Sequence, residues 1–299
     1  MSSGVGLTTI LKCLMAGEQE MGWQPEGWRA GSSACEDQKL FAAKQLGWRE
    51  SLALFDQESL RGYATTIHKN VLAKMTEWKM RIPPPPDLGS TAVYMISQLK
   101  ESLKWTKKGK RYHRGVDWPE FKLDKADFFR FGPGERDLVA VIKTDNGDMV
   151  YLMPDTGPVL EGMSLLKAIW VTEASMEPEL SPKYKGVVVP CVKAKIKAVL
   201  TWIIGLSNAG NVIAHAAQEI EFNMNEEGFA VVEETELVSL KCCVDLRELE
   251  PFVLSLKGEP IRFWRRRGLN DSANSYPISM FQFTKDHFVD PGNLEEIVN

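Results

Sequence analysis

The stretch from residue 213 to residue 256 decides the fold, and it reads IAHAAQEIEFNMNEEGFAVVEETELVSLKCCVDLRELEPFVLSL. Within it, residues 219–224 alternate polar and apolar side chains, which predicts a half-buried β-strand that ends at the acidic turn 225–228. Residues 251–256 predict a second strand, with a proline at its first position, where no ladder donor is needed. The two strands are joined by a charged connection of about twenty residues without helical caps. A connection this long is usually functional or disordered.

The size and composition fit a globular protein. The chain has 299 residues, of which 44% are hydrophobic and 25% are charged, and these are ordinary values. No apolar run approaches the ~18 residues that cross a bilayer, and no basic n-region precedes an apolar h-region. The five cysteines are an odd number without regular spacing, which predicts free thiols rather than disulfides or a zinc site. We therefore expect a cytoplasmic protein without a membrane segment.

Helical patterns dominate residues 1–91 and strand patterns dominate residues 92–299. Asp56 is a predicted N-cap for a long helix over 57–80, which the four prolines of 83–86 end. Asp145-Asn146-Gly147 predicts a hairpin between 138–143 and 149–153. Helices first and strands later favour the α+β class. The other predicted helices are 7–16, 39–46, 160–171 and 194–204, and the other predicted strands are 92–99, 186–190, 218–224, 261–266 and 278–283.

Several blocks, taken in order, resemble the serpin superfamily. They are the hairpin of 139–155, the stretch VVVPCVK at 187–193, the strand with its Asn-Glu-Glu-Gly turn, PFVLSL at 251–256, and ISMFQF at 278–283 followed by Val289-Asp290-Pro291. The order of strand, turn, long loop and PFVLSL resembles the end of strand 5A, the reactive-centre loop and strand 4B of serpins. The resemblance implies one serpin-like domain over residues 1–299.

The chain departs from the serpin pattern in its N-terminal half. Residues 2–17 resemble helix B, 56–80 resemble helix F and 93–105 resemble strand 3A. The chain is shorter than a typical serpin before strand 3A, so helices C, D and E and part of sheet A are missing or remodelled. The histidine that the family carries near the start of strand 5A aligns with Gln218 here.

The resemblance places a reactive-loop-like segment over residues 228–250. An inhibitory serpin carries small residues after the glycine, so that its cleaved loop can enter sheet A as a new strand. Residues 229–236 are bulky and acidic instead, and with two adjacent glutamates either register buries one of them. An unpaired buried carboxylate costs several kcal/mol, so we expect insertion to fail or to be slow. The candidate site residues of this segment are Gly228, Phe229, Ala230, Glu233, Glu234, Lys241, Cys242 and Cys243.

Within that segment the family pattern places the scissile bond near Cys242-Cys243. Lys241 would offer a trypsin-like protease an anchor one residue away. No sequence context lowers the pKa of either cysteine thiol visibly, which favours an incidental role for the pair over a nucleophilic one.

No catalytic, cofactor or metal motif stands in the sequence. It lacks G-x-S-x-G, H-E-x-x-H, Walker A and G-x-G-x-x-G motifs, and its four histidines lie far apart. The net charge of −4 gives no overall basic footprint for nucleic acid. The basic clusters 107–114 and 265–267 indicate solvated loops or turns, with a site for a polyanion or an acidic partner as the alternative.

These observations favour a non-inhibitory, serpin-fold binding or scaffold protein rather than an enzyme. Two alternatives stay open. One is an inhibitor of a serine or cysteine protease that uses the 228–250 loop. The other is a serpin fold recruited for small-molecule binding or catalysis at a concave apolar surface. The expected partners are a protease or a small hydrophobic ligand, with no nucleic acid, no membrane and no cofactor.

Overall fold

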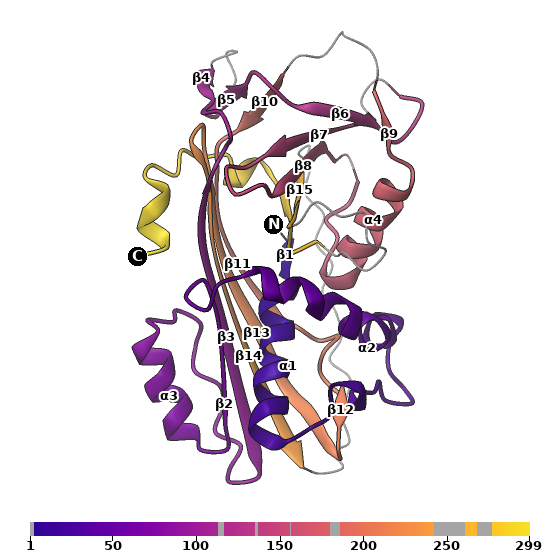
Figure 1. The fold of residues 1–299 in the computed structure, drawn as a ribbon, viewed down its shortest axis with the longest axis vertical. Coiled ribbons are helices and arrows are strands. Elements are labelled where there is room, and N and C mark those ends of the chain that lie inside the picture. Colours follow the sequence, from indigo (N-terminus) through magenta and orange to yellow (C-terminus); the bar gives the residue numbers. More distant parts are fainter. Residues whose placement is uncertain are drawn as a thin grey trace.

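The computed structural model describes residues 3–112, 117–134, 137–155, 157–179, 186–241, 261–267 and 277–299. These residues form helices and three antiparallel sheets, an α+β architecture (Figure 1). The α-helices are α1 (Leu7–Met21), α2 (Glu36–Trp48), α3 (His68–Glu77) and α4 (Gly162–Ala174). The short 3-10 helices are η1 (Pro25–Gly27), η2 (Arg49–Leu54), η3 (Lys285–His287) and η4 (Leu294–Ile297).

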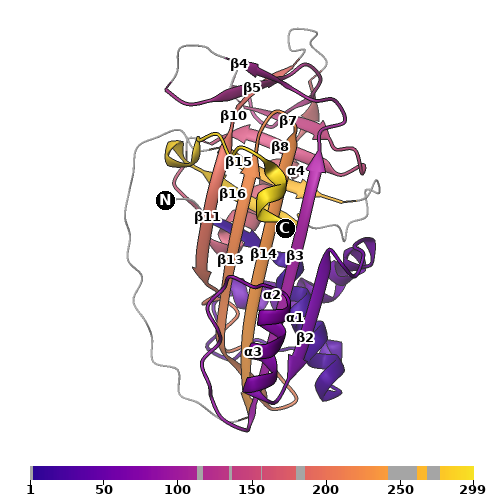
Figure 2. The same cartoon turned by 90° about the vertical axis from the view of Figure 1, so that its left-hand side faces the viewer.

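The central sheet runs the length of the molecule, and its strands lie side by side in Figure 2. Its strand order is β11 (Val192–Val199), β13 (Asn211–Met224), β14 (Gly228–Lys241), β3 (Ala92–Lys104) and β2 (Leu60–Thr65), and the short β12 (Ser207–Asn208) pairs with β13. β14 therefore lies in the middle of the sheet, with strands on both sides.

Two further sheets lie toward the upper end in Figure 1. The first has the order β1 (Ser3–Gly6), β16 (Ser279–Phe283), β15 (Ile261–Arg266), β8 (Met149–Pro154), β7 (Leu138–Lys143), β6 (Asp127–Arg130) and β9 (Glu177–Pro178). The second has the order β10 (Val187–Pro190), β5 (Glu120–Leu123) and β4 (Lys110–Tyr112).

Helices cover both faces of the lower half of the central sheet. α1 packs on the face that we call inner, and α3 packs on the opposite, outer face (Figure 1). Successive side chains of β3 point to opposite faces of the sheet, so Val93 and Met95 face α1 while Tyr94 and Ile96 face α3. β3 therefore contributes to the hydrophobic core on each face. Higher up, the inner face packs on β15 and β16 of the seven-stranded sheet through an aromatic cluster formed by Phe222, Phe229, Phe263, Phe281 and Phe283.

Most of the helices and strands expected from the sequence are present. α1, α2 and α4 contain or overlap the predicted helices at 7–16, 39–46 and 160–171. β7 and β8 form the hairpin predicted from Asp145-Asn146-Gly147, and Gly147 takes a φ of 88° in its turn. None of the helices among the residues described is both long and apolar enough to cross a membrane.

The long helix predicted over 57–80 is wrong. Asp56 does cap a turn, since its Oδ1 accepts hydrogen bonds from the backbone N–H of Glu58 and Ser59 at 2.9 and 2.7 Å. The chain then runs as β2, and the helix, α3, begins only at His68. The three- and four-residue spacing of apolar side chains suggested a helix, but residues 60–65 form a short strand. Pairing with β3 stabilises this strand over the helix.

The helix predicted over 194–204 is also wrong, because residues 192–199 form β11. Val192, Ala194 and Ile196 are buried, and the lysines between them are exposed. This is the two-residue period of a strand with one face on the core. The strand predicted at 251–256 lies outside the residues that the structure describes.

Candidate functional site

The expected reactive-loop segment is a buried strand over its first fourteen residues. β14 pairs along its whole length with β13 and β3, from Phe229 opposite Leu103 to Leu240 opposite Ala92. Its residues from Gly228 to Ser239 are buried. Insertion of this acidic segment is expected from the sequence to fail or to be slow, and the expectation that it fails is wrong. The physical reason is that its buried polar groups meet partners on both faces of the sheet.

On the inner face, Glu233 and Thr235 meet a set of hydroxyl and amide groups. The Ser279 hydroxyl donates to Glu233 Oε1 at 2.5 Å. Gln218 Nε2 donates to Thr235 Oγ1 at 2.8 Å, and Thr9 Oγ1 lies 2.8 Å from the same oxygen. Gln218 also bridges to the backbone of Gly6. These bonds join β14 to α1, β13 and β16.

Within the described part of the chain, Glu233 is a buried acid with only one of its two carboxylate oxygens hydrogen-bonded. Its side chain is fully buried, and its Oε2 has no hydrogen-bond partner among the described residues. Burial raises the pKa of Glu233 to about 7, although the bond from Ser279 and the nearby Arg265 oppose this shift. Gly6 stands against this carboxyl group, and a Cβ there would come within 2.1 Å of Oε2.

On the outer face, Glu234 and Glu236 have partners of their own. Glu234 Oε2 accepts from the backbone N–H of Arg81 and Ile82 at 2.6 and 2.8 Å, and Gln98 Nε2 donates to Oε1 at 2.7 Å. His215 Nε2 lies 2.7 Å from Glu236 Oε1. A carboxylate that accepts three hydrogen bonds can be buried at a modest cost. Each of the three glutamates of β14 therefore has at least one hydrogen-bond partner, although Glu233 Oε2, Glu236 Oε2 and Ser239 Oγ have none among the described residues.

The turn into β14 is also tied to its surroundings. Trp105 donates its backbone N–H to the Glu227 carbonyl at 3.0 Å and its indole N–H to the Asn225 carbonyl at 2.9 Å. Gly228 is needed for close approach, because a Cβ there would lie 1.9 Å from the Leu103 carbonyl oxygen. Phe229 and Ala230 follow in the aromatic core and the sheet. Lys241 is exposed at the end of the strand, whereas Cys242 and Cys243 lie outside the described residues.

The cluster 265–267 is a buried ionic network and not a solvated turn. Arg265 is fully buried on β15, donates to Glu101 Oε2, and has its Nε 3.5 Å from Asp148 Oδ2. Arg267 binds the other oxygen of Glu101 and also Asp148. Burial by itself would raise the pKa of Glu101, but Arg265 and Arg267 hold it below its usual value. This network joins β3 and β15 to the turn between β7 and β8.

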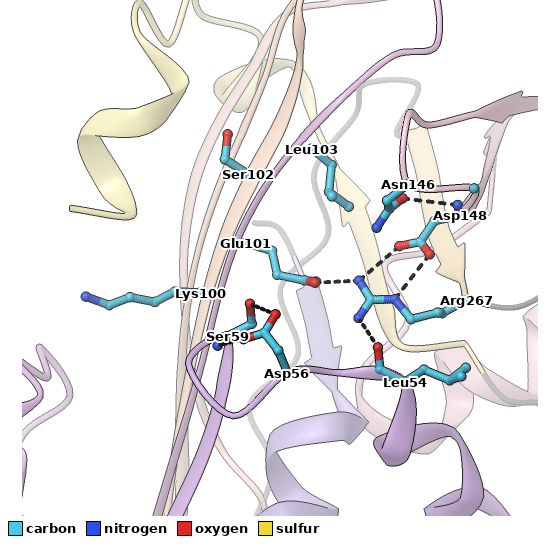
Figure 3. Close-up of a pocket in the computed structure, with 11 residues that line it drawn as sticks. Leu54, Asp56, Ser59, Lys100, Glu101, Ser102, Leu103, Asn146, Asp148 and Arg267 are labelled. Atoms are coloured by element: carbon cyan, nitrogen blue, oxygen red, sulfur yellow. Dashed lines mark hydrogen bonds and ion pairs between the residues drawn. The ribbon is translucent and has the colours of Figure 1, made fainter.

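A pocket of about 570 Å³ opens beside this network (Figure 3). Glu101, Asp148 and Arg267 turn toward one another on one side of β3, while Lys100 points to the opposite side. Asp56 is bound by Ser59. Because its lining carries the charged groups of Glu101, Asp148 and Arg267, the pocket differs from the concave apolar surface expected for a small hydrophobic ligand. A second pocket of about 730 Å³ lies between β1 and β11 and includes Trp202.

The described part of the basic cluster 107–114 is matched by acids. Lys107 and Lys110 lie 3.9 and 3.6 Å from Asp124, and Lys108 pairs with Glu227 at 2.5 Å. Arg111 binds Glu226 and Asp290. His113 and Arg114 are not among the described residues. This surface offers little unmatched positive charge to a polyanion.

Among the described residues, the remaining candidates form neither a metal site nor a reactive thiol site. No three His, Cys, Asp or Glu side chains there stand close enough to hold a metal ion. Cys13, Cys35 and Cys191 are free thiols, as expected. Burial raises the pKa of Cys191 to about 11, which leaves it protonated and unreactive near neutrality.

The sequence pointed to Glu233 and Glu234 but not to the groups that receive them. Ser279, Gln98 and the backbone of residues 81–82 come from distant parts of the chain. Arg265 and Glu101 were missed as a pair for the same reason, since 164 positions separate them. The strand predicted at 261–266 is present as β15, but nothing in the local sequence indicated that its arginines are buried against acids.

Comparisons with known proteins bear on the fold. No protein-family model matches the sequence, and the sequence of no curated protein matches it either. Solved structures do match. "Cleaved Serpin 42Da" is 13% identical over 94% of this chain and 91% of its own, with a TM-score of 0.54. "Structure of a loop C-sheet serpin polymer" is 8% identical over 96% and 90%, with a TM-score of 0.55.

A third structure, "Crystal Structure of a Thermophilic Serpin, Tengpin, in the Latent State", is 11% identical, covers 95% of this chain and 92% of its own, and has a TM-score of 0.52. The architecture is therefore that of a serpin, as the sequence blocks predicted. This chain is a divergent protein with the serpin fold, and identities this low establish the fold alone.

Proposed function

We propose that this protein does not inhibit proteases and acts instead by binding, as a carrier or scaffold built on the serpin fold. The observation that carries the proposal is the position of β14 in an uncleaved chain. The segment equivalent to the reactive loop already fills the centre of the sheet, and its polar residues have specific partners there.

An inhibitor of the serpin type depends on a loop that enters the sheet only after cleavage, because insertion releases the free energy that traps the protease. A chain whose strand is already inserted has no such free energy to release. The sequence of β14 supports a permanent strand, since Glu234 accepts from the backbone N–H groups of Arg81 and Ile82 and Glu236 lies against His215. β14 therefore has a structural role, and binding takes place at the molecular surface.

Cleavage at the end of β14 tests the proposal. Lys241 is exposed, so limited trypsin digestion is expected to cut after it among its first sites. We expect the melting temperature of the nicked protein to stay the same or fall, because no strand remains to insert. No complex with trypsin should survive SDS. A melting temperature raised by tens of degrees, or an SDS-stable complex, would show that the protein is an inhibitor.

A further inference from the structure

The outer edge of β2 has a row of backbone groups without partners. β2 is an end strand of the central sheet, and in Figure 2 it lies outermost on the side opposite β11. Lys100 donates its backbone N–H to the Ser59 carbonyl at 2.9 Å, so residues 61, 63 and 65 continue the ladder to β3. Leu60, Gly62 and Ala64 therefore direct their backbone groups away from the sheet.

Only one of those outward groups is used by the described residues. The Leu60 N–H donates to the Asp56 carbonyl at 3.1 Å. The Leu60 carbonyl and the N–H and carbonyl groups of Gly62 and Ala64 have no partner in the described parts of the chain. Leu60 and Ala64 are buried, whereas Arg61, Gly62 and Tyr63 are half-buried, so the part of this edge that solvent reaches centres on Gly62. An exposed edge of this kind is a template for another strand.

Positive charge surrounds this edge on both faces of the sheet. Arg61 stands on the outer face, over the Trp78 ring at 4.9 Å. Lys100 and Lys79 lie close to it: burial lowers the pKa of Lys100 most, Arg61, Arg81 and Lys79 lower it further, and Glu234 opposes them. On the inner face, Lys12 lies against Gly62, where a Cβ would come within 2.8 Å of its Cγ.

The four cations Lys12, Arg61, Lys79 and Lys100 lack an ion pair with any carboxylate of the described residues. The opposite edge of the sheet is different. On β11, Lys195 and Lys197 pair with Glu219 at 2.5 and 2.9 Å, and Lys195 also pairs with Glu221 at 2.8 Å. The β2 edge thus gathers four cations without ion pairs in the described part of the chain, whereas two of the three lysines of β11 are paired with acids. A cationic edge repels cationic strands and favours an acidic one.

We propose that the open edge of β2 binds an acidic segment of a partner protein, which adds to the central sheet as an extra strand. Backbone hydrogen bonds to Gly62 and Ala64 supply affinity, and acidic side chains opposite Arg61 and beside Lys12 supply specificity. Asp56 and Glu58 lie at the turn before β2 and would repel acidic side chains there. We therefore place the acidic part of the partner further along the strand, opposite Arg61 and Tyr63. The inference rests on the proposed binding function and names its partner by chemistry.

A fluorescein-labelled hexapeptide of alternating glutamate and valine tests this inference by fluorescence anisotropy with the intact protein. We expect saturable binding with a Kd below about 1 mM at low salt, and binding that weakens as salt rises. The matching lysine–valine peptide should not bind. The glutamate peptide with all its backbone nitrogens methylated should not bind either, because it keeps the charge and cannot pair as a strand.

Variants separate the edge from the rest of the surface. Arg61→Glu with Lys100→Glu is expected to weaken binding at least about tenfold, and Ala64→Pro to do the same, since proline removes an outward N–H without breaking the ladder to β3. Lys193→Glu, on the opposite edge, should leave Kd unchanged within about twofold. A melting curve for each variant verifies that it folds.

Three results would overturn the inference: no saturable binding of the glutamate peptide, equal binding of the methylated peptide, or equal weakening by Lys193→Glu. None of these bears on whether β14 is a permanent strand. Conversely, a large rise in melting temperature after cleavage at Lys241 would contradict the proposed non-inhibitory role. It would not affect the conclusion drawn from peptide binding.

Discussion

Replacing Arg265 with methionine is expected to destabilise the protein by about 3–5 kcal/mol, the usual cost of removing one partner from a buried ion pair. Arg265 is fully buried, and it faces Glu101 and Asp148, of which neither is more than a tenth exposed. Methionine fits the space of the arginine stem but leaves these carboxylates short of a counter-ion. Urea unfolding followed by tryptophan fluorescence measures the change.

The matched control for this variant is Arg111→Met. Arg111 also binds two carboxylates, Glu226 and Asp290, but its side chain is 39% exposed. Solvent screens such a pair, so its loss should cost no more than about 1 kcal/mol. Adding Glu101→Gln to Arg265→Met should recover part of the lost stability, because it removes one of the two carboxylates that then share Arg267 as their counter-ion. Equal effects of Arg265→Met and Arg111→Met would show that the network is not buried.

The stability of the protein is expected to fall as the pH rises from about 4.5 to about 7, through the ionisation of Glu233. The pKa of Glu233 is raised by burial from 4.5 to about 7 in the folded protein. The unfolded chain therefore releases this proton first, and above the folded pKa the native state must hold a buried charge. A shift of this size corresponds to about 3 kcal/mol of stability lost at pH 8 relative to pH 4.

Glu233→Gln isolates this effect, since glutamine keeps the shape and cannot ionise. The variant should be about 3 kcal/mol more stable than the parent at pH 8 and close to it at pH 5. Glu236 changes stability in the same direction, because burial raises its pKa despite the bond from His215, so the difference between the two proteins is the quantity to compare. Glu20→Gln, at an exposed position of α1, is the control. Parallel pH profiles for parent and Glu233→Gln would contradict the assignment.

Local patterns in the sequence predicted a large part of the fold. The hairpin at Asp145-Asn146-Gly147 and the strand that ends at Met224 follow from turn chemistry and from a two-residue period, and the structure confirms both. The errors at 57–80 and 194–204 have a common cause. Leu60 and Ile196 fit a helical spacing as well as a strand, and only pairing with β3 and β13 decides between them.

The state of β14 could not be predicted from local sequence. Glu233 and Glu234 looked incompatible with a buried strand because the cost of burying a carboxylate depends on its partners. Those partners are 46 and 153 positions away, at Ser279 and Arg81. Long-range hydrogen bonds of this kind leave no local pattern. The triple arginine at 265–267 misled in the same way, since its counter-ions lie on β3 and in the turn after β7.

Hydrogen exchange of the intact, uncleaved protein tests most directly the claim that β14 is a permanent central strand. Amide protons within Ala230–Val238 should exchange as slowly as those of the neighbouring β13, because both strands are paired on two sides and buried. Protection should persist in the protein before any protease is added. If amide protons of this segment exchange as fast as those of an open loop while β13 stays protected, the claim is contradicted. The protease-inhibitor alternative would then be favoured.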